Sequence, residues 1–141
     1  VAINWLLTGY GMDYAGKKIV IVGNGRLVGA PLAKLWLASG LQPEVVDKQT
    51  DNLTEITKTA DILVTATGVA GLISSEMVRP DAVIVDAGVA TDANGLIGDV
   101  QEAVRLMPGI SITPTKGGVG PLTVAALFEN VITAARNSVA V

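Results

Sequence analysis

Hydrophobic runs without polar alternation punctuate the chain at regular intervals. Residues 19–22, 62–65 and 83–88 are rich in Val, Ile and Leu, which is typical of strands buried on both faces of a parallel sheet. Shorter apolar strands are predicted at residues 44–47 and 110–113. Apolar residues at helical spacing lie between and around these strands, and they predict helices at residues 2–10, 27–39, 53–59, 100–107 and 122–137.

The alternation of strands and helices predicts an α/β domain with a doubly wound, mostly parallel sheet and helices on both faces, which is a Rossmann-like arrangement. The whole chain, residues 1–141, is expected to form one domain, and residues 1–11 are expected to be a connector helix to a preceding domain. Residues 74–78 predict one or two helical turns stopped by Pro80, and residues 91–98 predict a loop or hairpin. In the final helix, the apolar residues Val124, Leu127, Val131 and Ala134 share one face.

The amino-acid composition excludes several kinds of catalytic group and metal site. The chain has no cysteine and no histidine, which excludes disulfides, a thiol nucleophile, an imidazole base and the usual zinc sites. A net charge of -3 argues against a nucleic-acid-binding surface. No apolar run approaches membrane-spanning length and no signal peptide is visible. We therefore expect no metal, no nucleic acid and no membrane partner, and a cytoplasmic location; because the chain begins at Val1 rather than Met, a fragment of a longer protein is also expected.

A glycine turn after the first strand is the strongest candidate binding feature. Gly23, Gly25 and Gly29 lie between the strand at 19–22 and the helix that follows. Such a turn presents free N–H groups and the positive end of the helix dipole, which suit a pyrophosphate. The alternative is a tight strand-to-helix turn without a ligand.

An acidic residue and further glycines follow the other strands. Asp47 ends the second strand, about 20 residues after the glycine turn, where a carboxylate often accepts hydrogen bonds from the adenosine ribose; the alternative is a solvated turn carboxylate. Gly68 and Gly88 follow later strands, and Gly117 and Gly118 lie in a second glycine-rich loop. Because ligands of doubly wound sheets bind at the carboxyl ends of the strands, we expect Gly23 and these four glycines to converge on one cleft.

Several motifs together resemble the C-terminal NAD(P)-binding domain of bifunctional methylenetetrahydrofolate dehydrogenase/methenyltetrahydrofolate cyclohydrolases. The family loop P-G-G-V-G-P-[ML]-T is similar to residues 117–123, and its V-G-x-P motif is similar to residues 28–31. Its D-V-G-[IV] and G-D-V motifs resemble residues 86–89 and 98–100. The four motifs occur in the family's order across essentially the whole chain.

The resemblance implies a set of cofactor contacts. It places the dinucleotide on the glycine turn, the nicotinamide against Val89, and the nicotinamide amide near Thr123. It also places a tetrahydrofolate derivative beside the loop that contains Gly117, Gly118 and Pro121. The residues expected to bind cofactor are Gly23, Asn24, Gly25, Arg26, Val28, Gly29, Asp47, Gly68, Val89 and Thr123.

Departures from the family pattern bear on the choice of cofactor. The family's Arg-Ser pair is Asn24-Gly25 here, and its usual basic residue after the second strand falls at about Gln49. Fewer cations and the carboxylate of Asp47 disfavour a 2′-phosphate. We therefore predict NAD over NADP, although Arg26 and Lys48 are near enough in the sequence to supply a cation. Two loops also differ: the family's G-K-P-G turn is residues 68–71 here, and its Val-Pro pair is residues 115–116.

The resemblance also implies that the catalytic groups are elsewhere. In the family, the Tyr-x-x-x-Lys pair and most folate contacts belong to an N-terminal domain that does not precede Val1. Tyr14 and Lys18 match that spacing, but they flank the entry to a buried strand, and we interpret the match as chance. No catalytic residue is therefore assigned, and the chain alone is expected to bind dinucleotide without turning over folate.

Two alternative functions stay open, and a homodimer is a further expectation. The chain could be a stand-alone nucleotide-binding or assembly module without catalysis, or the cofactor domain of another dehydrogenase. The loop at residues 117–123 speaks against the last, because a generic dinucleotide domain does not require it. Exposed strand edges make a homodimer a further expectation, with residues 91–98 as a candidate contact.

Overall fold

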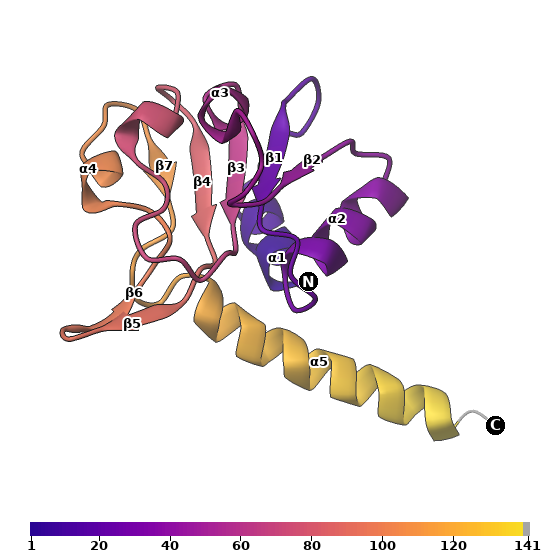
Figure 1. Cartoon of the computed structure of the whole chain (residues 1–141). Helices are drawn as coiled ribbons and strands as arrows, with labels where there is room; N and C mark the ends of the chain where they lie inside the picture. Colours follow the sequence, from indigo (N-terminus) through magenta and orange to yellow (C-terminus); the bar gives the residue numbers. More distant parts are fainter. Residues whose placement is uncertain (140–141) are drawn as a thin grey trace.

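A five-stranded parallel sheet forms the centre of the molecule, which is a computed structural model describing residues 1–139. The strand order is β2-β1-β3-β4-β7 (Figure 1). The strands are β1 (Ile19–Val22), β2 (Glu44–Val46), β3 (Ile62–Thr65), β4 (Val83–Asp86) and β7 (Ser111–Ile112). The chain moves outward from β1 in one direction to β2 and in the other to β3, so the predicted doubly wound topology is confirmed.

Helices cover both faces of the sheet, as the sequence predicted. On one face, α1 (Ala2–Gly9) and α2 (Gly29–Ala38) pack against alternate strand residues, with Trp36 fully buried among them. On the other face lie α3 (Leu53–Thr57), the 3₁₀ turn η1 (Ser75–Met77) and α4 (Glu102–Arg105). Because neighbouring residues of a strand point to opposite faces, Ile21 joins the first core and Val20 and Val22 join the second.

The strand register brings the functional loops to one edge. Val22 of β1 pairs with Val46 of β2 and with Thr65 of β3, and Thr65 in turn pairs with Asp86 of β4. The carboxyl ends of these four strands are therefore level. Every loop that follows them begins at the same edge of the sheet.

The structure settles one element that the sequence left open and shifts the start of two helices. Residues 91–98 form a hairpin of β5 (Ala90–Asp92) and β6 (Gly95–Ile97), which resolves the choice between loop and hairpin. The last helix, α5 (Val119–Val139), begins three residues earlier than predicted, inside the glycine-rich loop. Helix α2 begins at Gly29 rather than Leu27, because residues 23–28 are needed for the turn.

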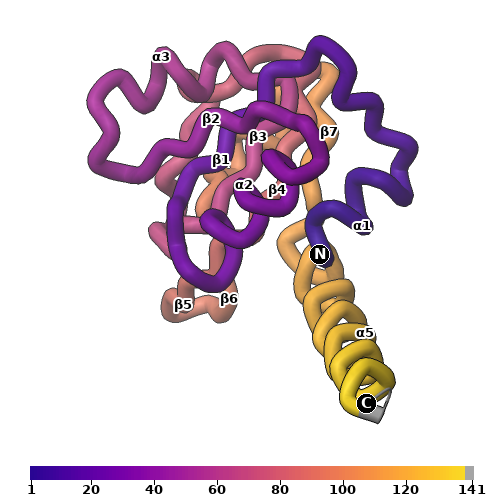
Figure 2. Tube along the Cα trace, turned by 90° about the vertical axis from the view of Figure 1, so that its right-hand side faces the viewer, coloured from indigo at the N-terminus to yellow at the C-terminus, as the bar shows by residue number. Residues whose placement is uncertain are grey.

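Helix α5 leaves the body of the molecule. Its first turns lie beside α1, and the rest extends away from the sheet (Figures 1 and 2). The shared apolar face predicted for this helix exists but is exposed: Leu127 is 62% and Phe128 is 64% accessible. Among the described residues, no helix combines the length and the apolar character needed to cross a membrane.

Candidate dinucleotide and folate site

The turn between β1 and α2 is built by close backbone contact. The N–H of Gly23 donates to the carbonyl of Val46 on β2 (2.7 Å), which fastens the turn to the sheet. A Cβ atom on Gly29 would overlap the carbonyl of Gly23, so only glycine lets α2 start this close to the strand. Asn24, Gly25 and Arg26 are exposed at the tip of this turn. The geometry leaves the backbone at the start of α2 accessible to an anion.

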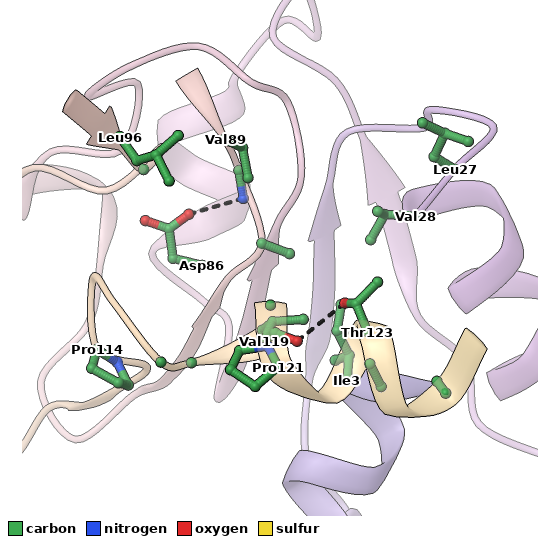
Figure 3. A pocket seen from close by; sticks show the side chains of 18 of the residues that line it. Ile3, Leu27, Val28, Asp86, Val89, Leu96, Pro114, Val119, Pro121 and Thr123 are labelled. Atoms are coloured by element: carbon green, nitrogen blue, oxygen red, sulfur yellow. Dashed lines mark hydrogen bonds between the residues drawn. The ribbon is translucent and has the colours of Figure 1, made fainter. Parts of the chain in front are cut away.

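A cavity of about 800 Å³ opens beside this turn at the carboxyl edge of the sheet. Three segments line it: residues 27–32 at the start of α2, residues 86–89 after β4, and residues 114–123 before and within α5 (Figure 3). The hairpin adds Leu96 and Ile97, and α1 adds Ile3. The volume lies within the range of sites that hold drug-sized ligands and cofactors.

The cavity brings together six of the residues predicted from sequence. They are Val28, Val89, Gly117, Gly118, Pro121 and Thr123. Val89 is 68% exposed, and the hydroxyl of Thr123 donates to the carbonyl of Val119 (3.1 Å) within α5. These six residues come from three distant parts of the chain. Of the glycines expected to converge on one cleft, Gly88, Gly117 and Gly118 line this cavity, whereas Gly23 and Gly68 do not.

The other predicted residues lie outside this cavity, along the same edge. Gly23, Asn24, Gly25, Arg26 and Gly29 form the neighbouring turn. Gly68 follows β3, where an added Cβ atom would contact the carbonyl of Val89, and Asp47 follows β2. They therefore extend the site from β4 across β1 to β2.

Asp47 is exposed and is held by its own turn. Its Oδ1 accepts from the N–H of Gln49 (2.8 Å), and its N–H donates to the hydroxyl of Thr50 (2.9 Å). The carboxylate is thus fixed in orientation at the end of β2. Both interpretations from sequence, a ribose acceptor and a turn carboxylate, fit this geometry.

The match of Tyr14 and Lys18 to a catalytic spacing lies at the wrong edge. Both residues precede β1, whereas the cavity lies beyond its carboxyl end. Lys18 pairs with Glu44 (3.1 Å), and the ring of Tyr14 packs on Trp36 with centroids 6.0 Å apart. Lys18 is thus held at the sheet edge, and the Tyr14 ring packs against the core on the α1–α2 face.

Sequence reasoning assigned no role to two carboxylates beneath the cavity. Asp86 lines it, and Asp99 is completely buried behind it. Burial, reinforced by the charge of Asp86, raises the pKa of the Asp99 carboxyl above its ordinary value, and hydrogen bonds from Thr67 oppose the shift. The available signal was that each of these aspartates belongs to one of the family motifs matched at residues 86–89 and 98–100.

Comparison with known proteins agrees with this geometry. Residues 1–139 match the family model described as tetrahydrofolate dehydrogenase/cyclohydrolase, NAD(P)-binding domain. The chain is 42% identical over 132 residues to the bifunctional protein FolD of Lacticaseibacillus casei, covering 93% of this chain and 47% of that protein. It is 47% identical over 127 residues to FolD of Methanospirillum hungatei, covering 89% and 45%.

Solved structures give the same result. The Campylobacter jejuni FolD methylenetetrahydrofolate dehydrogenase/cyclohydrolase superposes with a TM-score of 0.88 at 37% identity, covering 97% of this chain and 49% of that one. The Trypanosoma brucei enzyme, complexed with NADP and an inhibitor, gives a TM-score of 0.86 at 34% identity, covering 98% and 50%. The chain therefore spans about half the length of the relatives it matches. On this evidence the chain belongs to the family of NAD(P)-binding domains of tetrahydrofolate dehydrogenase/cyclohydrolases.

Proposed function

We propose that this chain is the cofactor half of an enzyme that oxidises 5,10-methylenetetrahydrofolate with NAD(P) and hydrolyses 5,10-methenyltetrahydrofolate. The observation that carries the proposal is the meeting of the glycine turn after β1 and the loop at residues 117–123 at one edge of the sheet. The glycine turn suits the pyrophosphate of a dinucleotide. The loop at residues 117–123 lines a further part of the cavity, which dinucleotide binding alone does not require. The names of the curated relatives support the same activity.

The topology suggests how the cofactor would lie. Its pyrophosphate would rest on the start of α2, where the helix dipole and backbone N–H groups favour negative charge. Asp47 would accept hydrogen bonds from the adenosine ribose over β2. The nicotinamide, which supplies the hydride acceptor, would enter the cavity between Val89 and Thr123, and Gly117, Gly118 and Pro121 would border the folate.

We further propose that a second domain covers α5 and supplies the catalytic groups. The relatives are about twice as long as this chain, and α5 leaves an apolar face exposed beside α1. This face consists of Val124, Leu127, Phe128, Val131 and Ile132. A soluble monomer rarely leaves such a contiguous apolar stripe uncovered.

The proposal predicts binding without turnover, with NAD preferred. In titration calorimetry the chain should bind NAD more tightly than NADP. Asp47→Ala should weaken NAD binding about tenfold, because a charge-assisted hydrogen bond is lost. Asp47→Asn keeps the local turn and should weaken the preference by removing the charge.

The controls separate this selection from a general charge effect. Asp51→Ala removes an exposed carboxylate of the following turn and should change neither affinity. Tighter NADP binding by the wild type would overturn the role of Asp47 and indicate Arg26 or Lys48 as phosphate contacts. Binding of neither dinucleotide, or vigorous cyclohydrolase activity of the 141-residue chain, would contradict the proposed function.

We propose a cytoplasmic homodimer as the working assembly. The β5–β6 hairpin supports this, because both of its strands are short, exposed and unpaired on their outer edges within the described chain. Sedimentation equilibrium should show a dimer that Thr91→Pro, which removes an edge N–H, converts to a monomer. A wild-type monomer at all concentrations would refute the dimer.

A further inference from the structure

Two carboxylates tie together the loops at the carboxyl ends of β3 and β4 and the exit of the hairpin. Asp86 Oδ1 accepts from the hydroxyl of Thr65 (3.2 Å) and from the N–H groups of Gly88 and Asp99 (both 3.1 Å). Its Oδ2 accepts from the N–H of Val100 (3.1 Å). One side chain therefore fixes the end of its own strand, the neighbouring strand and the segment after β6.

Asp99, after β6, connects its own segment to the loop that follows β3. Its Oδ2 accepts from both the N–H (2.6 Å) and the hydroxyl (2.8 Å) of Thr67. Its Oδ1 is buried and finds no hydrogen-bond partner in the described chain. The Thr67 hydroxyl also accepts from the N–H of Val69 (3.1 Å), so the loop after β3 is held in one conformation.

Glycines leave room for both carboxylates. A Cβ atom on Gly88 would overlap the carboxylate of Asp99, and a Cβ atom on Gly98 would overlap that of Asp86. Each aspartate thus sits directly over the backbone of the other's segment. The packing is reciprocal, and it fixes the distance between the β4 loop and the hairpin.

This network lies on one side of the predicted cofactor. From β1 the chain adds β2 on one side of the sheet and then β3 and β4 on the other, so the strand order switches at β1. At such a switch point one nucleoside is expected over β2 and the other over β3 and β4. Val89, labelled in Figure 3, and Gly88 line the cavity after β4. A Cβ atom added at Gly68 would come into contact with the carbonyl of Val89, so the loop after β3 lies close to them. Both loops held by the two carboxylates face that half of the site.

From this arrangement we infer that Asp86 and Asp99, with Thr67, are positioning residues for the nicotinamide half of the dinucleotide. They act through the backbone of residues 67–68 and 88–89 and do not touch the adenosine half. The inference rests on the proposed function, because it presumes that the cavity holds the nicotinamide.

The test compares a whole dinucleotide with its fragment. Dissociation constants are measured by calorimetry for NAD and ADP-ribose, or for NADP and 2′-phospho-ADP-ribose if NADP binds more tightly. Thr67→Val, Asp86→Asn and Asp99→Ala should weaken dinucleotide binding about tenfold and leave the fragment within twofold. Thr67→Ser retains the hydroxyl and should restore dinucleotide affinity.

A matched control distinguishes positioning from general loss of packing. Thr57 is buried, more so than the half-buried Thr67, and its hydroxyl donates to the carbonyl of Thr54 within α3, on a face away from the site. Thr57→Val should therefore change neither dissociation constant. Thermal unfolding of each variant identifies any that fails to fold, and Thr67→Val, which changes only one polar group, keeps the test decisive if Asp86→Asn does not fold.

Two outcomes would overturn the inference, and they differ. If the wild type binds both ligands and Thr67→Val weakens them equally or not at all, the network does not position the nicotinamide, and the proposed function stands. If the wild type binds neither ligand, the proposed function fails and the inference fails with it.

Discussion

At the scale of single residues, the buried carboxyl of Asp99 is the least expected feature of the domain. A fully buried carboxylate is costly unless it is well paired, and only one of its oxygens accepts hydrogen bonds. Burial therefore raises its pKa, with the charge of Asp86 acting in the same direction. The folded state consequently favours the protonated acid at Asp99 more than the unfolded chain does.

This predicts a pH-dependent difference between wild type and Asp99→Asn. Because the pKa of Asp99 is raised in the folded state, its ionised carboxyl lowers the free energy of unfolding by the full amount at pH values above that pKa. This loss is relieved as the pH falls toward the ordinary value of 3.8. The asparagine carries no such penalty at any pH. The free energy of unfolding of Asp99→Asn, minus that of the wild type, should thus be most positive at neutral pH and should decrease on acidification.

Urea unfolding of both proteins between pH 7 and pH 4 provides the measurement. The two proteins differ only at residue 99, so the difference between their unfolding free energies reports on that carboxyl and on its charge interaction with Asp86. A difference in unfolding free energy that is constant with pH, or that grows on acidification, would contradict the raised pKa.

At the scale of elements, the β1–α2 unit determines where the site forms. Gly29 starts α2 against the carbonyl of Gly23, and Gly23 is itself hydrogen-bonded to β2. Strand, turn and helix are therefore one packed unit, in which the turn backbone cannot move without displacing the helix. The same contact exposes the tip of the turn at Gly25, where no neighbouring atom restricts an added Cβ.

Gly29→Ala and Gly25→Ala should separate the packing of the turn from its expected contact with the dinucleotide. Gly29→Ala overpacks the contact and should lower the unfolding free energy by about 1–3 kcal/mol. Gly25→Ala should change it by less than about 0.5 kcal/mol, while weakening dinucleotide binding, because the methyl group faces the expected pyrophosphate. Thermal unfolding and calorimetry on both variants check this; equal stability losses would refute the packing argument.

The elements and the edge at which their loops meet were largely predictable from the sequence, whereas the side-chain contacts beneath that edge were not. The runs of residues at 19–22 and 62–65 are buried on both faces, and that pattern alone marks a central parallel strand. The convergence of Val89 with Gly117 also followed, because parallel strand ends meet at one edge. The Asp86–Asp99 network could not be predicted, since it depends on the hairpin returning Asp99 beneath β4, and local pattern carries no information about that return.

At the scale of the whole molecule, α5 distinguishes this domain from a self-contained one. Its periodicity predicted an apolar face, and a sequence pattern cannot tell whether that face meets its own domain or another. Only its beginning packs here, where Ala126 is buried beside α1. The remaining turns have the length of an isolated peptide helix that is marginal in water, as expected if the second domain proposed above packs on them.

Hydrogen–deuterium exchange, with and without saturating NAD or NADP, tests the central claim most directly, because it locates binding along the chain. The account predicts slower exchange at residues 23–29, 86–89 and 114–123 when dinucleotide is bound. Residues 53–57 of α3, on the opposite face of the sheet, should be unchanged, and the outer turns of α5 should exchange fast in both states. Protection confined to α3 or α5, or no protection at residues 23–29, would contradict a dinucleotide site at this edge of the sheet.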